Sequence, residues 1–362
     1  MRTKTLVFLL GVLAALAAIV GISLHKKGGT KQQEALGTPL FHDLAVNKIA
    51  WVTIQGPEKK VSLRRGKGHW EVVERYGYPA DFSRIVDLLR KMAQLKIGRR
   101  FQGSQDVLAR LSLHSPLDKT AKKEEKGTLI SLRDEKGSTV AEVILGKTRR
   151  SQKAGFPRAG QYVRIAGKTD IFLVDRTFPL TETDPVNWLD KKLLKVPPEQ
   201  IRRISATGKA DKLIYAFERT EKGKGLEPIG PLKGSKINQS KLKRLERAVS
   251  SLWLQDVLDP ATDPQTLGLD QETTITYELF DGVRYHIRTA APKGTNKKEY
   301  YLQIKKEAAQ KAKQINDRFS RWVFIIPKWA AEAFLKKPED LVEKPHGKKT
   351  KPSRQKRNKG KG

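Results

Sequence analysis

The chain has 362 residues, enough for two domains of ordinary size with extensions, and it is 38% hydrophobic and 31% charged. Lys and Arg number 72 against 39 Asp and Glu, so the formal net charge is +33. We expect attraction to phospholipid head groups, nucleic acid or acidic envelope polymers, although a uniformly basic, solvated surface would give the same charge. The absence of cysteine excludes disulfides, thiolate metal sites and cysteine nucleophiles.

The chain begins with an apolar segment. Residues 6–24 read LVFLLGVLAALAAIVGISL, and a helix of this length, at about 1.5 Å per residue, would span a hydrocarbon layer of ~30 Å. The only Ala-Leu-Ala triplet lies inside the run, and two lysines close it, which favours an uncleaved signal anchor over a removed signal peptide. We predict an anchor over residues 1–27 with its membrane positions at Leu6, Phe8, Leu10, Leu13, Leu16, Ile19, Ile22 and Leu24.

The residues on either side of this apolar segment are relevant to its orientation in a membrane. Basic residues nearly balance on its two sides, but a single N-terminal anchor most often delivers a long following domain across the membrane. We therefore predict a single-pass protein of the cell inner membrane, with the bulk of the chain on the extracytoplasmic side. Residues 28–39, GGTKQQEALGTP, predict a flexible stalk between the membrane and the first domain.

Two amphipathic helices are predicted, one in each half of the chain. The segments are ADFSRIVDLLRKMAQL and NQSKLKRLERAVSSLWL, and both carry apolar residues at steps of three, four and three with basic residues on the other face. Asp81 or Ser83 is expected to cap the first helix, and Asn238 or Ser240 the second. The apolar positions are Ile85, Leu88, Met92 and Leu95 in the first, and Leu242, Leu245, Val249 and Leu252 in the second.

Similar strand patterns surround both helices in the same order, which indicates an internal duplication. Each half closes on a matching pair of apolar segments, YVRIA with IFLV and YYLQI with VFII. We predict an α+β fold: an N-terminal transmembrane helix, followed by two tandem, similar domains of mostly antiparallel sheet with an amphipathic helix each. The domains are expected at 40–196 and 197–343, with the chain re-aimed at Pro197 and Pro198.

Several segments, in their order along the chain, resemble the bacterial domain of unknown function 4340 family: KIAWVTIQ, HWEVVERYGYPADFSRIVDLLRKMAQLKIGRRF, DVLARLSL, EVILGK, GQYVRIAGKTDIFLVD and NWLDKKLL. The resemblance covers residues 40–195 and, more loosely, the second copy to about residue 335. Where the family has Tyr-Gly-Leu after the helix, this chain has Leu-Ser-Leu at 111–113 and Leu-Gly-Leu at 267–269. The resemblance implies an envelope-facing protein with an accessory or scaffold role, often encoded beside gliding-type ABC transporter components, and it supplies no catalytic residue.

The motifs that suggest chemistry have structural interpretations. Gly-Lys-Thr occurs at 146–148 and 167–169, but neither copy has the earlier glycine that a phosphate-binding loop requires. The histidines show no pair at the i, i+4 spacing of a zinc helix, and a proline between His114 and Asp118 disfavours a shared helical face.

The acidic pairs and the tryptophans also have structural interpretations. The carboxylates at 134–135 are predicted in a charged turn, and those at 339–340 at a helix start, where acids suit the helix dipole. Most of the six tryptophans lie in apolar patterns typical of a core. We predict no catalytic, metal or cofactor site.

The end of the chain is a basic tail. Residues 344–362 contain nine Lys or Arg, no acid and almost no apolar residue, so this segment is expected to be disordered. It is either a solubilising tail or a contact for acidic lipid, an envelope polymer or nucleic acid, with sequence-specific nucleic-acid recognition disfavoured. The possible polyanion contacts are Lys348, Lys349, Lys351, Arg354, Lys356, Arg357, Lys359 and Lys361.

Three functional hypotheses follow from the sequence. The first is a non-enzymatic, membrane-anchored accessory or scaffold protein that associates with ABC transporter subunits or an envelope complex. The alternative is a membrane-tethered module that binds a polyanion. An enzyme is a third hypothesis, because a site assembled from distant residues leaves no local motif.

Overall fold

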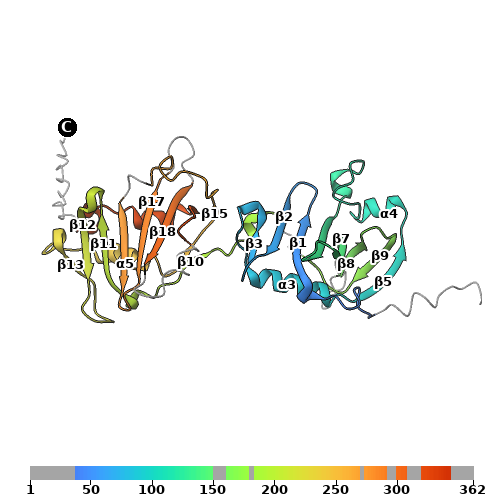
Figure 1. Ribbon diagram of the computed structural model, residues 1–362, viewed down its shortest axis with the longest axis horizontal. Coiled ribbons are helices and arrows are strands. Elements are labelled where there is room, and N and C mark those ends of the chain that lie inside the picture. Colours follow the sequence, from blue (N-terminus) through green and yellow to red (C-terminus); the bar gives the residue numbers. More distant parts are fainter. Residues whose placement is uncertain are drawn as a thin grey trace, which may run out of the picture. The chain divides into compact units, whose positions relative to one another are not determined.

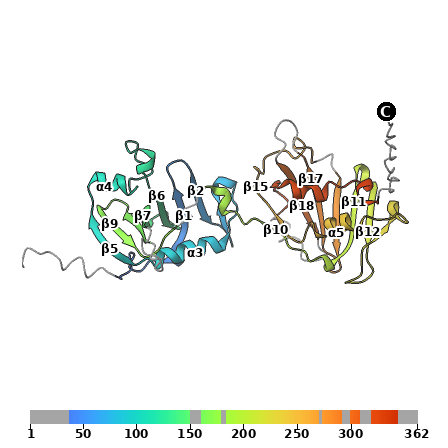
Figure 2. The ribbon, with the colours of Figure 1, turned by 180° about the vertical axis from the view of Figure 1, so that it is seen from behind.

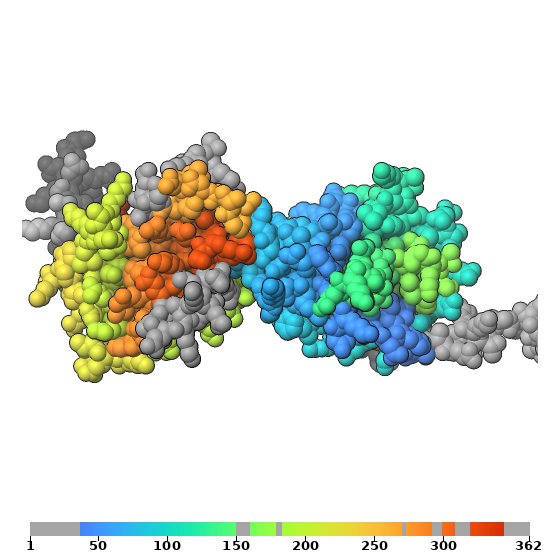
Figure 3. Space-filling model, in the orientation of Figure 1, coloured from blue at the N-terminus to red at the C-terminus, as the bar shows by residue number. Residues whose placement is uncertain are grey.

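The fold was analysed in a computed structural model, which describes residues 37–149, 160–178, 183–269, 273–291, 299–307 and 319–343. The chain divides into two compact units after Asp190. In the space-filling view the first unit carries the blue to green part of the sequence and the second unit the yellow to red part (Figure 3).

The first unit contains one nine-stranded sheet among its described residues, in the order β4-β3-β2-β1-β6-β7-β8-β9-β5 (Figure 1). Its helices are α3 (Phe82–Ala93) and α4 (Gln105–Arg110), with single 3-10 turns at Val46–Lys48, Val73–Arg75, Lys123–Glu125 and Pro185–Trp188. Its strands are β1 (Ile49–Gln55), β2 (Lys60–Arg65), β3 (Trp70–Val72), β4 (Tyr78–Pro79), β5 (Ile97–Gln102), β6 (Thr128–Asp134), β7 (Thr139–Arg149), β8 (Gly160–Ile165) and β9 (Asp170–Val174).

The second unit contains an eight-stranded sheet in the described part of the chain, in the order β13-β12-β11-β16-β17-β18-β19-β15. The separate pair β10 (Lys192–Leu194) and β14 (Leu252–Trp253) lies in the same unit, with helices α5 (Gln239–Arg247), α7 (Lys328–Phe334) and α8 (Pro338–Leu341) and 3-10 turns at Pro198–Gln200, Lys209–Asp211 and Gly230–Leu232. The strands of the sheet are β11 (Ile201–Thr207), β12 (Leu213–Glu218), β13 (Glu227–Ile229), β15 (Asp256–Val257), β16 (Thr274–Leu279), β17 (Arg284–Ala290), β18 (Tyr300–Glu307) and β19 (Phe324–Ile326).

The two sheets share one connectivity. If β4 is set aside, each strand of the first sheet has a counterpart at the same place in the second, and all pairings within both sheets are antiparallel. The register agrees in detail, because β1 and β11 each have an irregularity between their first and third residues, against β6 and β16 respectively. Few helices accompany these sheets, and the expectation of mostly antiparallel sheet is confirmed.

The main helices are set by their caps and their apolar faces, and each lies against its own sheet (Figure 2). Asp81 caps α3, where its Oδ1 accepts from the backbone N–H of Ser83 at 3.0 Å, and Asn238 caps α5 by accepting from the N–H of Lys241 at 3.2 Å. All eight predicted apolar positions are buried. The second helix is shorter than expected, because α5 ends at Arg247 and the chain turns there before entering β14.

The boundary between the units differs from the sequence prediction, which placed it after Val196. Leu189 forms a bridge to Ala80, and the N–H of Asp190 donates to the carbonyl of Pro79 at 2.9 Å, so this segment completes the first unit. Lys192–Leu194 instead pair with β14 and belong to the second unit. The prolines at 197 and 198 therefore follow the junction rather than form it.

The start of the chain also needs a correction. The N–H of Gly37 donates to the carbonyl of Ile97 at 2.7 Å, so residues 37–39 are part of the first unit and not of the predicted stalk. The predicted anchor, residues 1–27, and the basic tail, residues 344–362, lie outside the described residues. Within the part that is described, no helix has the length and apolarity needed to cross a bilayer.

Candidate functional site

The predicted site residues are not among those the structure describes. The eight anchor positions between Leu6 and Leu24 and the eight basic positions between Lys348 and Lys361 fall in the two ends of the chain. The structure instead brings together three sets of side chains that no sequence motif had marked. Two lie in the second unit and one in the first.

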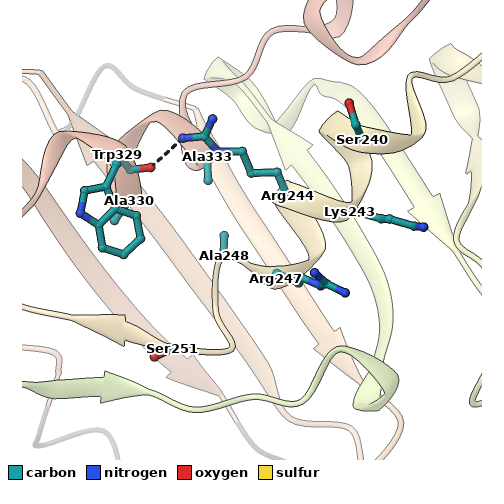
Figure 4. Close-up of a pocket in the computed structure, with 9 residues that line it drawn as sticks. All are labelled: Ser240, Lys243, Arg244, Arg247, Ala248, Ser251, Trp329, Ala330 and Ala333. Atoms are coloured by element: carbon teal, nitrogen blue, oxygen red, sulfur yellow. Dashed lines mark hydrogen bonds between the residues drawn. The ribbon is translucent and has the colours of Figure 1, made fainter.

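A basic hollow of about 360 Å³ lies between α5 and α7 (Figure 4). Arg244 extends from α5 towards α7, where its Nη2 donates to the carbonyl of Trp329 at 3.1 Å and lies 3.3 Å from Glu332 Oε2. In this view Lys243 and Arg247 extend from the other side of α5. The cations are thus spread along a helix and do not converge on one point, an arrangement that suits an extended polyanion better than a small anion.

An exposed aromatic side chain borders the same hollow. Trp329 is 62% exposed, because α7 turns its small residues and Phe334 towards the sheet and leaves Trp329 on the opposite side. Trp253 is also exposed, whereas Trp70, Trp188 and Trp322 are buried as the sequence predicts. An exposed indole beside Arg and Lys is a surface on which planar or sugar-like groups can stack.

A second, polar hollow lies on the outward face of the second sheet. Thr276 and His286 are cross-strand partners, and Thr276 Oγ1 lies 2.9 Å from His286 Nδ1. His286 Nε2 lies 3.1 Å from Glu307 Oε2, and Lys305 Nζ lies 2.8 Å from the other carboxylate oxygen. The hydrogen bond from Lys305, and next that from His286, lowers the pKa of Glu307.

This chain of hydroxyl, imidazole and carboxylate contains the groups that hydrolases use for proton transfer, but cross-strand polar pairs also stabilise a solvated sheet face. The three residues lie on β16, β17 and β18, and only the strand register makes them neighbours. Sequence spacing therefore had no signal by which to find them.

The Gly-Lys-Thr triplets have structural roles. Residues 146–148 lie within β7, and a side chain at Gly146 would clash with the carbonyl of Leu111, so the glycine lets the turn after α4 pack against the strand. Gly167 has a φ of +75° in the turn between β8 and β9. Neither triplet forms a phosphate-binding loop.

The remaining titratable motifs lie in turns and caps. Asp134 Oδ1 accepts from the N–H groups of Lys136 and Ser138 in the turn between β6 and β7, and Asp340 accepts from the N–H of Lys337 at the start of α8. His114 Nδ1 does approach Asp118 Oδ2, at 3.7 Å, through a loop rather than a helix. Among the described residues, no group of three or more His, Asp or Glu could hold a metal ion.

A family model described as "Domain of unknown function (DUF4340)" matches residues 70–272, more than half of the chain. The match begins at β3 and ends beyond β15, so it crosses from the first unit into the second, whereas the resemblance in the sequence had been strongest over 40–195. No curated protein and no solved structure matches the chain.

Proposed function

We propose that this chain, which belongs to the DUF4340 family, is a membrane-anchored accessory or scaffold protein of an ABC-type transporter or another envelope complex. The observation that carries the proposal is the duplication: one apolar segment is followed by two units with the same strand order. A tether with two related units presents two surfaces that share a fold and differ in side chains. Such a chain can hold two components of one complex together without performing chemistry.

Topology and partners provide the test. Protease added to intact spheroplasts should digest both units and leave a short membrane-bound fragment, because the bulk of the chain lies outside the cytoplasm. Mild-detergent purification of the full chain should co-purify transporter subunits, whereas residues 1–36 fused to an unrelated domain should not. Protection of both units until the cells are lysed, or repeated recovery of the chain alone, would contradict the proposal.

A second candidate is a membrane-tethered module that binds a polyanion, and the spread of Lys243, Arg244 and Arg247 along α5 favours it. Binding of the full chain to a single-stranded oligonucleotide or to acidic vesicles should then weaken steeply as salt increases. Replacing Lys243 and Arg247 with Gln should weaken binding more than the same change at Lys209 and Lys212, two exposed lysines remote from α5 in sequence. Equal effects of the two variants would show that α5 is not the binding surface. Binding that does not change with salt would contradict the proposal of a polyanion ligand.

A further inference from the structure

Helices α3 and α5 hold the same place in their units, but their outward faces differ. The caps Asp81 and Asn238 define the alignment, and both helices bury the same apolar stripe. In the first unit the neighbouring face carries Phe82, Val86 and Leu89. The corresponding residues in the second unit are Gln239, Lys243 and Glu246.

In the second unit an ion pair closes the space beside the helix. Glu246 of α5 pairs with Arg219, whose side chain is almost fully buried at the end of β12. The strand register makes Arg65 the counterpart of Arg219, but Leu89 stands where Glu246 would be. Arg65 instead lies over the ring of Trp70, with Cζ 5.6 Å from the ring centroid, and donates to the carbonyl of Asn47 at 3.1 Å.

The result is an apolar groove along α3, which has a volume of about 440 Å³. Its apolar lining includes Trp70, Val86, Leu89 and Phe82, the last of which is 62% exposed. The second unit maintains the same fold with polar residues at these places, so the fold does not require an apolar surface here. Exposed apolar hollows of this kind mark binding sites, and the volume is in the range of small-molecule pockets.

The charge around the groove indicates an anionic occupant. Arg65 and Arg90 are the charged residues of its lining, and no acidic residue lines it. Asp87 lies 3.3 Å from Arg90, but both side chains are more than half exposed, so water and salt screen this pair. A ligand with an aliphatic body and a negative head would match both features of the groove.

The groove lies beside the point where the chain enters the first unit. This position indicates a membrane as the source of such a ligand. Ala93 and Gln94 line the end of the groove, and the next residue, Leu95, accepts a hydrogen bond from the N–H of Leu40. The chain thus enters the unit beside the groove. Residues 25–36 connect this point to the apolar segment, and at ~3.5 Å per residue they reach at most about 40 Å.

We propose that the α3 groove binds one acyl chain of an anionic membrane lipid, whose head group contacts Arg65 and Arg90. This inference rests on the proposed membrane anchor. The acyl chain lies against Phe82, Val86 and Leu89 and covers the face that the second unit fills with the Arg219–Glu246 ion pair.

The test uses the full chain in nanodiscs of zwitterionic lipid, titrated with dibrominated stearate, because bromine quenches tryptophan at contact distance and Trp70 lines the groove. We expect saturable quenching that the variant Trp70→Phe lacks. The double variant Phe82→Gln, Val86→Lys carries the residues of the second unit and should fold, but it should bind at least about tenfold more weakly. Replacing Arg65 and Arg90 with Gln should abolish the preference for the stearate over the corresponding neutral alcohol.

Equal quenching of the wild type and the Phe82, Val86 variant would overturn the proposal, as would equal affinity for the acid and the alcohol in the wild type. A dimer in sedimentation experiments that this variant converts to monomer, with quenching unchanged, would make the groove an interface between two copies and also overturn it. Alkaline carbonate extraction of membranes tests the anchor separately. An anchored chain without groove binding and an unanchored chain are therefore distinguished.

Discussion

The backbone N–H of Asp81 donates a hydrogen bond to the carbonyl of Trp188 at 2.8 Å, which joins the cap of α3 to the segment that closes the first unit. The second unit repeats this bond between Asn238 and Leu341 at 2.9 Å. In both closing segments, residues 184–190 and 337–343, the second residue is a proline and the residue that accepts the bond is buried. The repeat therefore extends through Asp190 in the first unit, which is where the chain divides.

Truncating the buried residue of a closing segment should destabilise its unit. Trp188 is 3% exposed and Arg84 stacks over its ring, so Trp188→Ala should lower the free energy of unfolding of the first unit by about 3–5 kcal/mol. Leu341→Ala should cost the second unit about 2–5 kcal/mol. Urea denaturation followed by hydrogen exchange can assign each loss to its unit.

A matched control for these two changes is Leu117→Ala, because Leu117 is 65% exposed and its truncation should change stability by less than about 0.5 kcal/mol. If Trp188→Ala were as mild as this control, the segment at 184–190 would be a linker and not part of the first unit.

The caps of the two main helices should contribute similar amounts to the free energy of unfolding. Asp81→Ala and Asn238→Ala each remove the side-chain acceptor of the first turn and should destabilise the chain by about 1 kcal/mol in urea titrations. Asp81→Asn keeps an acceptor and should recover most of the loss. Ser240→Ala should cost less than Asn238→Ala, and the reverse order would identify Ser240 as the cap.

The turn at residues 111–113 and its counterpart at 267–269 show how a departure from the family pattern is accommodated. In the first unit the N–H groups of Ser112 and Leu113 donate to the carbonyls of Ala109 and Leu108, and in the second Gly268 and Leu269 make the same pair of bonds to Gln265 and Pro264. The residue before the buried leucine is left-handed in both, with φ of +53° at Ser112 and +80° at Gly268. Serine thus adopts the conformation that favours glycine.

The two turns should therefore respond differently to exchange. Gly268→Ser should destabilise the chain by about 1 kcal/mol, because a side chain is strained at this φ. Ser112→Gly should be nearly neutral, since relief of that strain offsets the loss of the hydrogen bond from Ser112 Oγ to the carbonyl of Glu124 at 2.7 Å. Chemical denaturation measures both. A large loss in Ser112→Gly would show that the hydroxyl, and not the backbone, maintains the turn.

Periodicity predicted much of the fold because the core residues repeat at helix or strand spacing. The stripe from Ile85 to Leu95 and its counterpart from Leu242 to Leu252 are buried as the pattern predicts. The end of α5 was placed too late, because Val249 and Leu252 continue a helical spacing although they lie in a turn and in β14. Periodicity reports which side chains face the core, and it does so whether or not the backbone remains helical.

The periodicity of apolar residues could not predict the closing segments or the candidate sites. DPVNWLD and KPEDLVE share little sequence, and their equivalence appears only in their bonds to the two helix caps. The groove along α3 depends on Leu89 standing where the second unit has the ion-paired Glu246, and a leucine in an amphipathic helix gives no sign of that exchange. Long-range pairing decides these features, and local patterns do not encode it.

Acid should weaken the closing segment of the first unit through Asp184. Its carboxylate accepts a hydrogen bond from Lys59 at 2.6 Å and another from the N–H of Val186, and the Lys59 bond is the main cause of a pKa below the ordinary value of 3.8. A lowered pKa in the folded state stabilises the fold above the ordinary pKa, and this contribution is lost as pH falls through the folded value.

Asp184→Asn keeps an acceptor for Val186 but removes the charge that Lys59 contacts. The free energy of unfolding of this variant, measured in urea from roughly pH 6 to roughly pH 2.5, should be lower than that of the wild type at the upper end and approach it at the lower end. The difference should be small, because both side chains are at least a third exposed. Lys59→Gln should show the same pH dependence and add nothing in the double variant, whereas a difference that stays constant across the range would show that the charge of Asp184 does not stabilise the segment.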